Sequence, residues 1–227
     1  MTTETKFIAG AGILTLILIV AASFFLGKQK SPEAQDTKVA DGQQLTADAK
    51  NTTGNPNAPV KIVEFGDYQC PACAAAEPIV KNVLAQNGES IYFVFRNFPL
   101  STHKNSQITA KAAEASSLQG KFWEMHDILY EKQNDWANSD NPQEILDQYA
   151  QSIGLDIDKF HEDMQSVTGI VNSDYALGNN VGVNSTPTFF INGQKYPGVI
   201  DQAQFQQIID GIVQSQPARE STTQAQP

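Results

Sequence analysis

The middle of the chain alternates between short apolar runs and stretches with helical spacing. Residues 60–66, VKIVEFG, place Lys61 and Glu64 among apolar residues and end at a glycine, which predicts a short, mostly buried strand. Residues 74–88 follow with a helical run ending at Asn-Gly, and the aromatic and β-branched residues of 91–99 predict a second strand. A strand, a helix and a strand at this spacing indicate a βαβ unit with a parallel strand pair and a right-handed crossover.

A longer helical region and a second pair of strands follow. Residues 186–198 predict a strand, a turn at Asn192-Gly193 and a short second strand, because Asn-Gly between strand-like runs is a strong hairpin signal. Residues 201–214 predict a closing helix with one apolar face. We therefore expect an α/β fold of the order βαβ, helical insert at about 103–168, ββα, with one central sheet and helices on both faces. Apolar spacing typical of helices occurs at 106–120, 121–132, 141–154, 156–166 and 170–182.

The N-terminal residues 1–30 predict a membrane segment. Residues 7–26 carry no charge, and a helix of that length spans about 30 Å, the thickness of a bilayer core. A cleaved signal peptide and a retained anchor both fit, since Val20-Ala21-Ala22 offers small residues for cleavage. The apolar run continues past that point through residues 24–26, which favours an uncleaved transmembrane anchor.

The segments on either side of the central region have a different composition. Residues 31–57 hold almost no large apolar side chains and cannot bury enough surface to offset the entropy of ordering, so they predict a disordered linker. Residues 214–227 predict a disordered tail for the same reason. The remainder, 58–213, is long enough to form one domain with its own core.

The balance of charge argues against one class of partner. The chain has a formal net charge of −10, and its only arginines are Arg96 and Arg219. A protein that binds nucleic acid needs a basic stripe to neutralise phosphates, and none is present in the sequence. We therefore expect no nucleic-acid partner.

The two cysteines of the chain, Cys70 and Cys73, are three residues apart in QCPAC. On the first turn of a helix, this spacing presents both sulfurs on one side, at a separation that a disulfide can bridge. Cys70 would lie at the helix N-terminus, where free N–H groups and the helix dipole favour a thiolate, and Pro71 suits the first helical position. Cys73, one turn further, is expected to be more buried and to act as the resolving thiol.

Two other uses of the pair are less compatible with the sequence. A structural disulfide across three residues closes almost no loop and would stabilise little. A zinc site needs two further ligands, and the candidates His103, His126 and His161 are scattered without paired spacing. The pattern therefore favours redox chemistry, with no metal.

Four separated features resemble the thioredoxin superfamily, and most closely the DsbA-like thiol–disulfide oxidoreductases of bacterial envelopes. The strand VEFGDYQ leads into Cys70-Pro71-Ala72-Cys73, and Pro78 follows where the active-site helix of that fold carries a kink. Thr186-Pro187 matches the cis-proline loop, and residues 122–133, FWEMHDILYEKQ, match the helical insert of the DsbA-like branch. The resemblance covers essentially all of 58–213 and implies a thioredoxin-like fold.

The resemblance also implies roles for individual residues. Cys70 would be the nucleophile and Cys73 the resolving cysteine of a redox-active disulfide, which is the only redox group expected. Thr186 and Pro187 would face that disulfide across a cis peptide bond and, with Pro71, contact an extended substrate that pairs with the Thr186 backbone. Glu64 would lie beneath the disulfide, with a raised pKa, and relay protons to Cys73. The alternative for Glu64 is a strand residue that points to solvent.

Two positions depart from the family's patterns and leave the direction of electron flow open. Ala72 stands where some strong oxidants have a histidine, and Gln69 precedes Cys70 where thioredoxins usually have tryptophan. The favoured function is donation of the Cys70–Cys73 disulfide to folding secreted or envelope proteins. The alternatives are a disulfide reductase or isomerase, and a peptide-binding or chaperone module in which the cysteines are incidental.

The expected compartment follows from the anchor and the cysteine pair together. A disulfide donor works in an oxidising compartment, so we expect a single-pass membrane protein with its catalytic domain outside the cytoplasm. This expectation overrides a weak opposite bias from Lys6, Lys28 and Lys30. Because the chain has no further cysteine to reoxidise the pair, the resemblance implies a quinone-linked membrane thiol oxidase as partner, of the DsbB or vitamin K epoxide reductase type.

Overall fold

The computed structural model describes residues 40–215. The predicted membrane segment 1–30 lies outside the described residues, as do the first part of the predicted linker and most of the predicted tail. Between residues 40 and 215, none of the helices combines the length and apolar character that a bilayer crossing requires.

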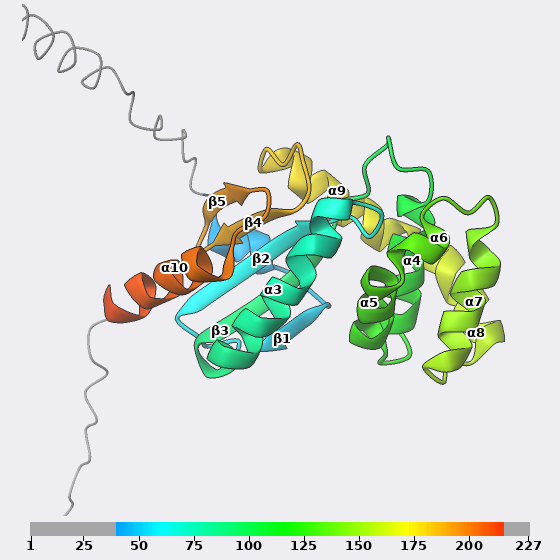
Figure 1. Ribbon diagram of the computed structural model, residues 1–227, viewed down its shortest axis with the longest axis horizontal. Coiled ribbons are helices and arrows are strands. Elements are labelled where there is room, and N and C mark those ends of the chain that lie inside the picture. Colours follow the sequence, from blue (N-terminus) through cyan, green and yellow to red (C-terminus); the bar gives the residue numbers. More distant parts are fainter. Residues whose placement is uncertain (1–39, 216–227) are drawn as a thin grey trace, which may run out of the picture. The chain divides into compact units, whose positions relative to one another are not determined.

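A five-stranded sheet of order β1-β3-β2-β4-β5 forms the centre of the domain (Figure 1). Strands β2 (Val60–Gly66) and β3 (Ile91–Asn97) pair in parallel, and α3 (Pro71–Asn87) connects them, followed by the short 3-10 turn η1 (Gly88–Ser90). This arrangement confirms the βαβ unit predicted from the apolar pattern.

The C-terminal hairpin extends the sheet beyond β2. Strand β4 (Thr188–Ile191) pairs antiparallel with both β2 and β5 (Gln194–Pro197). Asn192 and Gly193 connect the strands with φ angles of 47° and 85°, which is the left-handed region that Asn and Gly tolerate and that a tight hairpin turn requires. The predicted strand, turn and strand are therefore confirmed.

Two helices cover one face of the sheet, the active-site helix α3 and the closing helix α10 (Gln202–Ser215) (Figure 1). Alternate residues of β2 and β3 point toward this face, among them Ile62, Phe93 and Phe95. Each large side chain that is fully buried in this way contributes about 1.5–3 kcal/mol. Glu64 follows Ile62 by two residues and so shares the face beneath α3.

The opposite face carries a smaller apolar cluster. Phe65 from β2 and Phe98 from the loop after β3 meet edge-to-face with ring centroids 6.3 Å apart. Helix α9 (Thr168–Asn180) packs over them at Gly178, where an added Cβ would lie 2.6 Å from the Phe98 ring. The close approach of this helix to the sheet therefore requires a glycine.

The helical insert is confirmed as a group of helices that gather to one side of the sheet (Figure 1). The four helices predicted between 106 and 166 are present, and a short fifth helix holds the buried Trp136, whose Nε1 donates to the Leu129 carbonyl oxygen at 3.0 Å. The stretch 170–182 forms most of α9. The insert consists of α4 (Ser106–Ser117), α5 (Phe122–Glu131), α6 (Gln133–Trp136), α7 (Pro142–Ser152) and α8 (Ile157–Ser166).

The prediction of a disordered linker over 31–57 is wrong for its last part, and the domain does not begin at 58. Helix α2 (Gly42–Thr46) buries Leu45 in the smaller cluster, and β1 (Thr52–Gly54) pairs antiparallel with β3. Backbone pairing, the buried Leu45 and hydrogen bonds from Arg96 to the carbonyl oxygens of Leu45 and Ala47 hold this segment, and none of these leaves an apolar pattern in the sequence. At the other end, α10 continues to Ser215, so residues 214 and 215 are helical rather than part of a disordered tail.

Candidate active site

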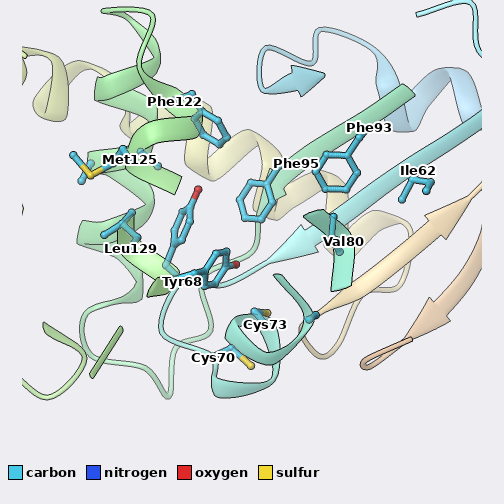
Figure 2. Packing of buried hydrophobic residues seen from close by; sticks show 14 of the residues in the cluster. Ile62, Tyr68, Cys70, Cys73, Val80, Phe93, Phe95, Phe122, Met125 and Leu129 are labelled. Carbon is cyan, nitrogen blue, oxygen red and sulfur yellow. The ribbon is translucent and has the colours of Figure 1, made fainter. Parts of the chain in front are cut away.

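Cys70 is the N-cap residue of α3, with φ −75° and ψ 120°, and Pro71 occupies the first helical turn. The Cys70 N–H donates to the Asp67 carbonyl oxygen at 3.0 Å, which sets the turn before the helix. Cys73 is completely buried, Cys70 is 7 % exposed, and both are free thiols. Figure 2 shows the two sulfurs at the first turn of α3, with Tyr68 between this turn and the side chains of α5.

A loop from the other end of the sequence faces the cysteines. The Thr186-Pro187 peptide bond is cis, as the resemblance implied, and both residues are buried. The Cys70 thiol donates to the Thr186 carbonyl oxygen at 3.3 Å. Pro71, predicted with them to contact substrate, is exposed beside Cys70. The fold thus brings together Cys70, Pro71, Thr186 and Pro187 as the sequence predicted.

The two thiols differ in acidity. A hydrogen bond from the Cys73 thiol is the main cause that lowers the pKa of Cys70 to about 5, against the opposing effect of burial. The backbone N–H groups of Ala72 and Cys73 at the helix N-terminus contribute in the same direction. Burial raises the pKa of Cys73 well above its ordinary value, and the adjacent Cys70 and Glu64 add to this. At neutral pH the pair therefore holds one thiolate, on Cys70, and one thiol.

Glu64 lies buried beneath α3, 2 % exposed, which excludes the alternative of a solvent-facing strand residue. Its Oε2 has no hydrogen-bond partner among residues 40–215. Burial raises the pKa of Glu64 well above its ordinary value, and the negative charges of Glu77 and Cys70 act in the same direction. A carboxyl group in this setting retains its proton to a higher pH than a surface glutamate.

A buried chain of polar groups that the sequence did not reveal lies next to Glu64. His126 Nε2 is 3.1 Å from Glu77 Oε2, and His126 Nδ1 is 3.0 Å from the Tyr68 hydroxyl. Burial raises the pKa of Tyr68 well above its ordinary value, so the hydroxyl keeps its proton. His126 therefore links the Tyr68 hydroxyl to the Glu77 carboxyl through its two ring nitrogens. The one signal in the sequence was Glu77, four residues after Cys73 and therefore on the same helix face.

The same cluster contains the side chains in the described region that could best hold a metal ion. Ligand atoms of Glu77, His126 and Asp127 all lie within 4.8 Å of one another. The Lys81 ammonium, however, contacts Asp127 Oδ2 at 2.7 Å and already supplies a positive charge there. A metal ion at this position would have to displace Lys81, and the cysteines take no part in the cluster.

Comparison with known proteins agrees with this geometry. A family model described as thioredoxin matches residues 46–211. The crystal structure of a thioredoxin-like oxidoreductase from Silicibacter pomeroyi DSS-3 has a TM-score of 0.68 and 28% identity, over 78% of this chain and 100% of that one. BdbD from Bacillus subtilis, in its oxidised form, has a TM-score of 0.64 and 26% identity, over 72% of this chain and 92% of that one.

Curated relatives of similar sequence are much longer proteins. An Na(+)/H(+) antiporter NhaA 3 from Salinispora tropica is 38% identical over 154 residues, which is 66% of this chain and 23% of the antiporter. The chain thus spans about a quarter of the length of the curated relatives it matches.

Proposed function

Because the chain belongs to the thioredoxin family, we propose that it is a thiol–disulfide oxidoreductase that works through Cys70 and Cys73. The observation that carries this proposal is the asymmetry of the pair. The pKa of Cys70, at the N-terminus of α3 and beside the Thr186-Pro187 loop, is lowered, whereas Cys73 is buried and holds its proton. Such a pair supplies an attacking or leaving thiolate and a resolving thiol.

In the proposed reaction the Cys70–Cys73 disulfide accepts two electrons from a substrate dithiol. A substrate thiolate attacks Cys70 Sγ, forms a mixed disulfide and breaks the Cys70–Cys73 bond, and Cys73 leaves as a thiolate that takes up a proton. The second substrate thiolate then attacks the substrate sulfur of the mixed disulfide. The substrate disulfide forms, and Cys70 leaves as a thiolate, so the substrate is oxidised and the cysteine pair is reduced.

Disulfide donation is the favoured direction because the reduced form is stabilised by its thiolate. With the pKa of Cys70 at about 5, the Cys70 thiolate is a stable leaving group at neutral pH. Stabilisation of the reduced form makes a disulfide couple more oxidising. This supports an oxidase over a reductase, which would need a more stable disulfide. A peptide-binding module with incidental cysteines would need neither the acidic Cys70 nor the protonated Cys73.

The neighbouring residues have roles that follow from their positions. Glu64, buried beneath α3, is proposed to give a proton to Cys73 when the thiolate leaves and to take it back when the pair is reoxidised. Thr186 is proposed to pair through its backbone with an extended substrate, with Pro187 and the exposed Pro71 against the substrate on either side of Cys70.

The setting of the reaction is proposed from the sequence. The apolar segment 7–26 would tether the domain to the outer side of a cell membrane, where folding secreted proteins are the thiol substrates. Because the chain has only two cysteines, a partner must reoxidise the pair, and we propose a quinone-linked membrane thiol oxidase. The likeness to a thioredoxin-like oxidoreductase and to BdbD supports the exchange chemistry rather than this setting.

An equilibrium titration of the protein in glutathione redox buffers tests the direction. An oxidase is expected to be half reduced in a mildly reducing buffer, at a potential near those of oxidising members of the superfamily, about −120 to −180 mV. A midpoint near that of cytosolic thioredoxins, about −270 mV, would instead assign a reductase. If the Cys70→Ser variant refolded a reduced secreted protein at the wild-type rate, the protein would be a peptide-binding or chaperone module rather than an oxidoreductase.

A further inference from the structure

The loop that leads into α3 is held by the helical insert through two glutamines. Gln69 Nε2 donates to the Ala137 carbonyl oxygen at 2.7 Å, and Gln69 Oε1 accepts from the Asn105 N–H at 2.6 Å. Gln133 Nε2 donates to the carbonyl oxygens of Tyr68 and Cys70, at 2.7 Å and 3.0 Å. The first glutamine belongs to the loop, whereas the second reaches the loop from the insert.

The position of Gln133 is itself well fixed. It is the first residue of α6, the short helix that buries Trp136, and Trp136 is anchored to α5 through Leu129. Gln133 also ends the stretch 122–133, which the sequence marked as typical of the insert. The two donor hydrogens of one primary amide are used on two backbone carbonyls that flank residue 69.

The orientation of the Cys70 carbonyl group is coupled to the position of the Cys70 sulfur. The same oxygen accepts the first helical hydrogen bond of α3, from the Ala74 N–H at 3.2 Å. As N-cap, Cys70 has extended rather than helical backbone angles, and this places its sulfur at the free N–H groups of the helix. A rotation of the Cys70 backbone would move the sulfur away from those N–H groups and from Thr186.

We propose that Gln133 is a positioning residue for disulfide exchange, which fixes the backbone of Tyr68 and Cys70 and so keeps the Cys70 sulfur at the N-terminus of α3 and beside Thr186. This proposal rests on the proposed function, because it assigns a role within the same site. The hydrogen bonds that Gln133 donates to the cysteine loop end on backbone oxygens rather than on a cysteine sulfur. Gln133 acts on the reaction through the backbone of Cys70.

The Gln133→Met variant tests the proposal, since methionine keeps the length of the side chain and removes both donors. Gln143→Met is the matched control, because Gln143 also lies on the insert and uses its Nε2 on Asp147 and Met164 instead of the cysteine loop. The measurements are the ultraviolet titration of the Cys70 thiolate in the reduced protein, the equilibrium with glutathione, and the denaturant unfolding curve.

The expected result is a thiolate pKa higher by about half a unit to one unit in Gln133→Met, which lowers the ratio of thiolate to thiol about three- to tenfold. The equilibrium with glutathione should move toward the disulfide form by a similar factor, and Gln143→Met should leave both readouts at the wild-type value. Equal thiolate titrations in the two variants, with equal losses of stability, would overturn the proposal and leave Gln133 a structural residue only.

A second variant, Gln133→Asn, tests the same proposal if Gln133→Met folds poorly. Gln133→Asn keeps the amide but is shorter by one methylene, so it should shift the thiolate pKa in the same direction, and an unshifted pKa would also overturn the proposal. The titration of the thiolate requires no turnover. If the wild-type protein exchanged no disulfides with any substrate, the proposed function would fail while the thiolate shift in Gln133→Met would still report the positioning role.

Discussion

The Cys70 sulfur lies 3.3 Å from the carbonyl oxygen of Thr186, a residue 116 positions later in the sequence. This contact joins the N-terminus of α3 to the start of β4 and makes one site from two distant segments. The thiol of Cys70 is the donor, so the contact belongs to the protonated form, and ionisation frees the Thr186 carbonyl for another donor. An extended substrate could supply that donor from its backbone.

Replacement of each cysteine separately should distinguish the role of Cys70 from that of Cys73. Cys70→Ser removes the attacking and leaving thiolate, so oxidation of a reduced peptide should stop. Cys73→Ser keeps Cys70 but removes the resolving thiol, so the Cys70 thiolate should attack a peptide that carries a disulfide, and the resulting mixed disulfides should accumulate as reducible adducts visible by mass spectrometry. Adducts at Cys73 in the Cys70→Ser variant, formed as rapidly, would contradict the assignment of the buried thiol as the resolving one.

The acidity of Cys70 predicts a pH profile for alkylation of the reduced protein. Because its pKa is lowered to about 5, the rate of reaction with iodoacetamide should rise through about pH 5 and level off well below the ordinary thiol range, near 9.0. Mass spectrometry after partial alkylation should locate the label on Cys70. A rate that continues to rise up to pH 9 would show that the site leaves Cys70 an ordinary thiol.

The same shift predicts how the stability of the reduced protein depends on pH. The folded state lowers the pKa of Cys70 below its unfolded value, so this thiolate stabilises the fold most at high pH, and the contribution is lost as pH falls toward about 5. Reduced protein should therefore gain stability relative to the oxidised protein between about pH 5 and about pH 8. Urea unfolding of both forms across this range measures the difference, and the stability of the Cys70→Ser variant should lack this gain with rising pH.

Glu64→Gln should stabilise the protein and slow exchange. The substitution keeps the shape of the side chain and removes a buried carboxyl group whose Oε2 is unpaired among residues 40–215, so we expect a gain of about 1–3 kcal/mol at neutral pH. Because the pKa of Glu64 is raised in the folded state, its cost grows as pH rises and vanishes below about pH 4. Urea unfolding at low and at neutral pH measures the gain.

The kinetic effect of Glu64→Gln should appear in the pH profile of exchange. Loss of the proton-exchanging group should slow release of Cys73 from the Cys70–Cys73 disulfide during substrate attack, chiefly near neutral pH, while alkylation of Cys70 in the reduced protein stays fast. The exposed Glu89→Gln is the control and should change neither stability nor rate. An unaltered exchange rate in Glu64→Gln would contradict the proton-exchange role and leave Glu64 with an effect on stability alone.

Leu45→Ala tests whether the end of the predicted linker is part of the domain. Leu45, on α2, is 1 % exposed and packs in the smaller apolar cluster, so its truncation should cost about 2–4 kcal/mol of unfolding free energy. Val213→Ala, at a position 40 % exposed on α10, should cost about 0.5 kcal/mol or less. Equal losses of unfolding free energy in the two variants would show that residues 40–57 are a linker and not part of the folded domain.

The order of elements was predictable because each one leaves a local pattern. Alternation marked β2 and β3, helical periodicity marked the insert, and Asn192-Gly193 marked the hairpin turn. Strand β1 was not predictable, since its residues Thr-Thr-Gly are polar and their pairing with β3 uses only backbone groups. Leu45, a single apolar residue in a polar stretch, was equally uninformative before its burial was known.

For the site, the sequence by itself determined which groups can react. Two cysteines at this spacing after a strand define the redox pair and the helix N-terminus that makes one of them acidic. Only the tertiary structure decided the burial of Glu64, the His126–Glu77 contact and the hold of Gln133 on the Cys70 carbonyl. The physical reason is that desolvation and hydrogen bonding depend on which distant segments enclose a group, and this is set by packing rather than by its neighbours in the chain.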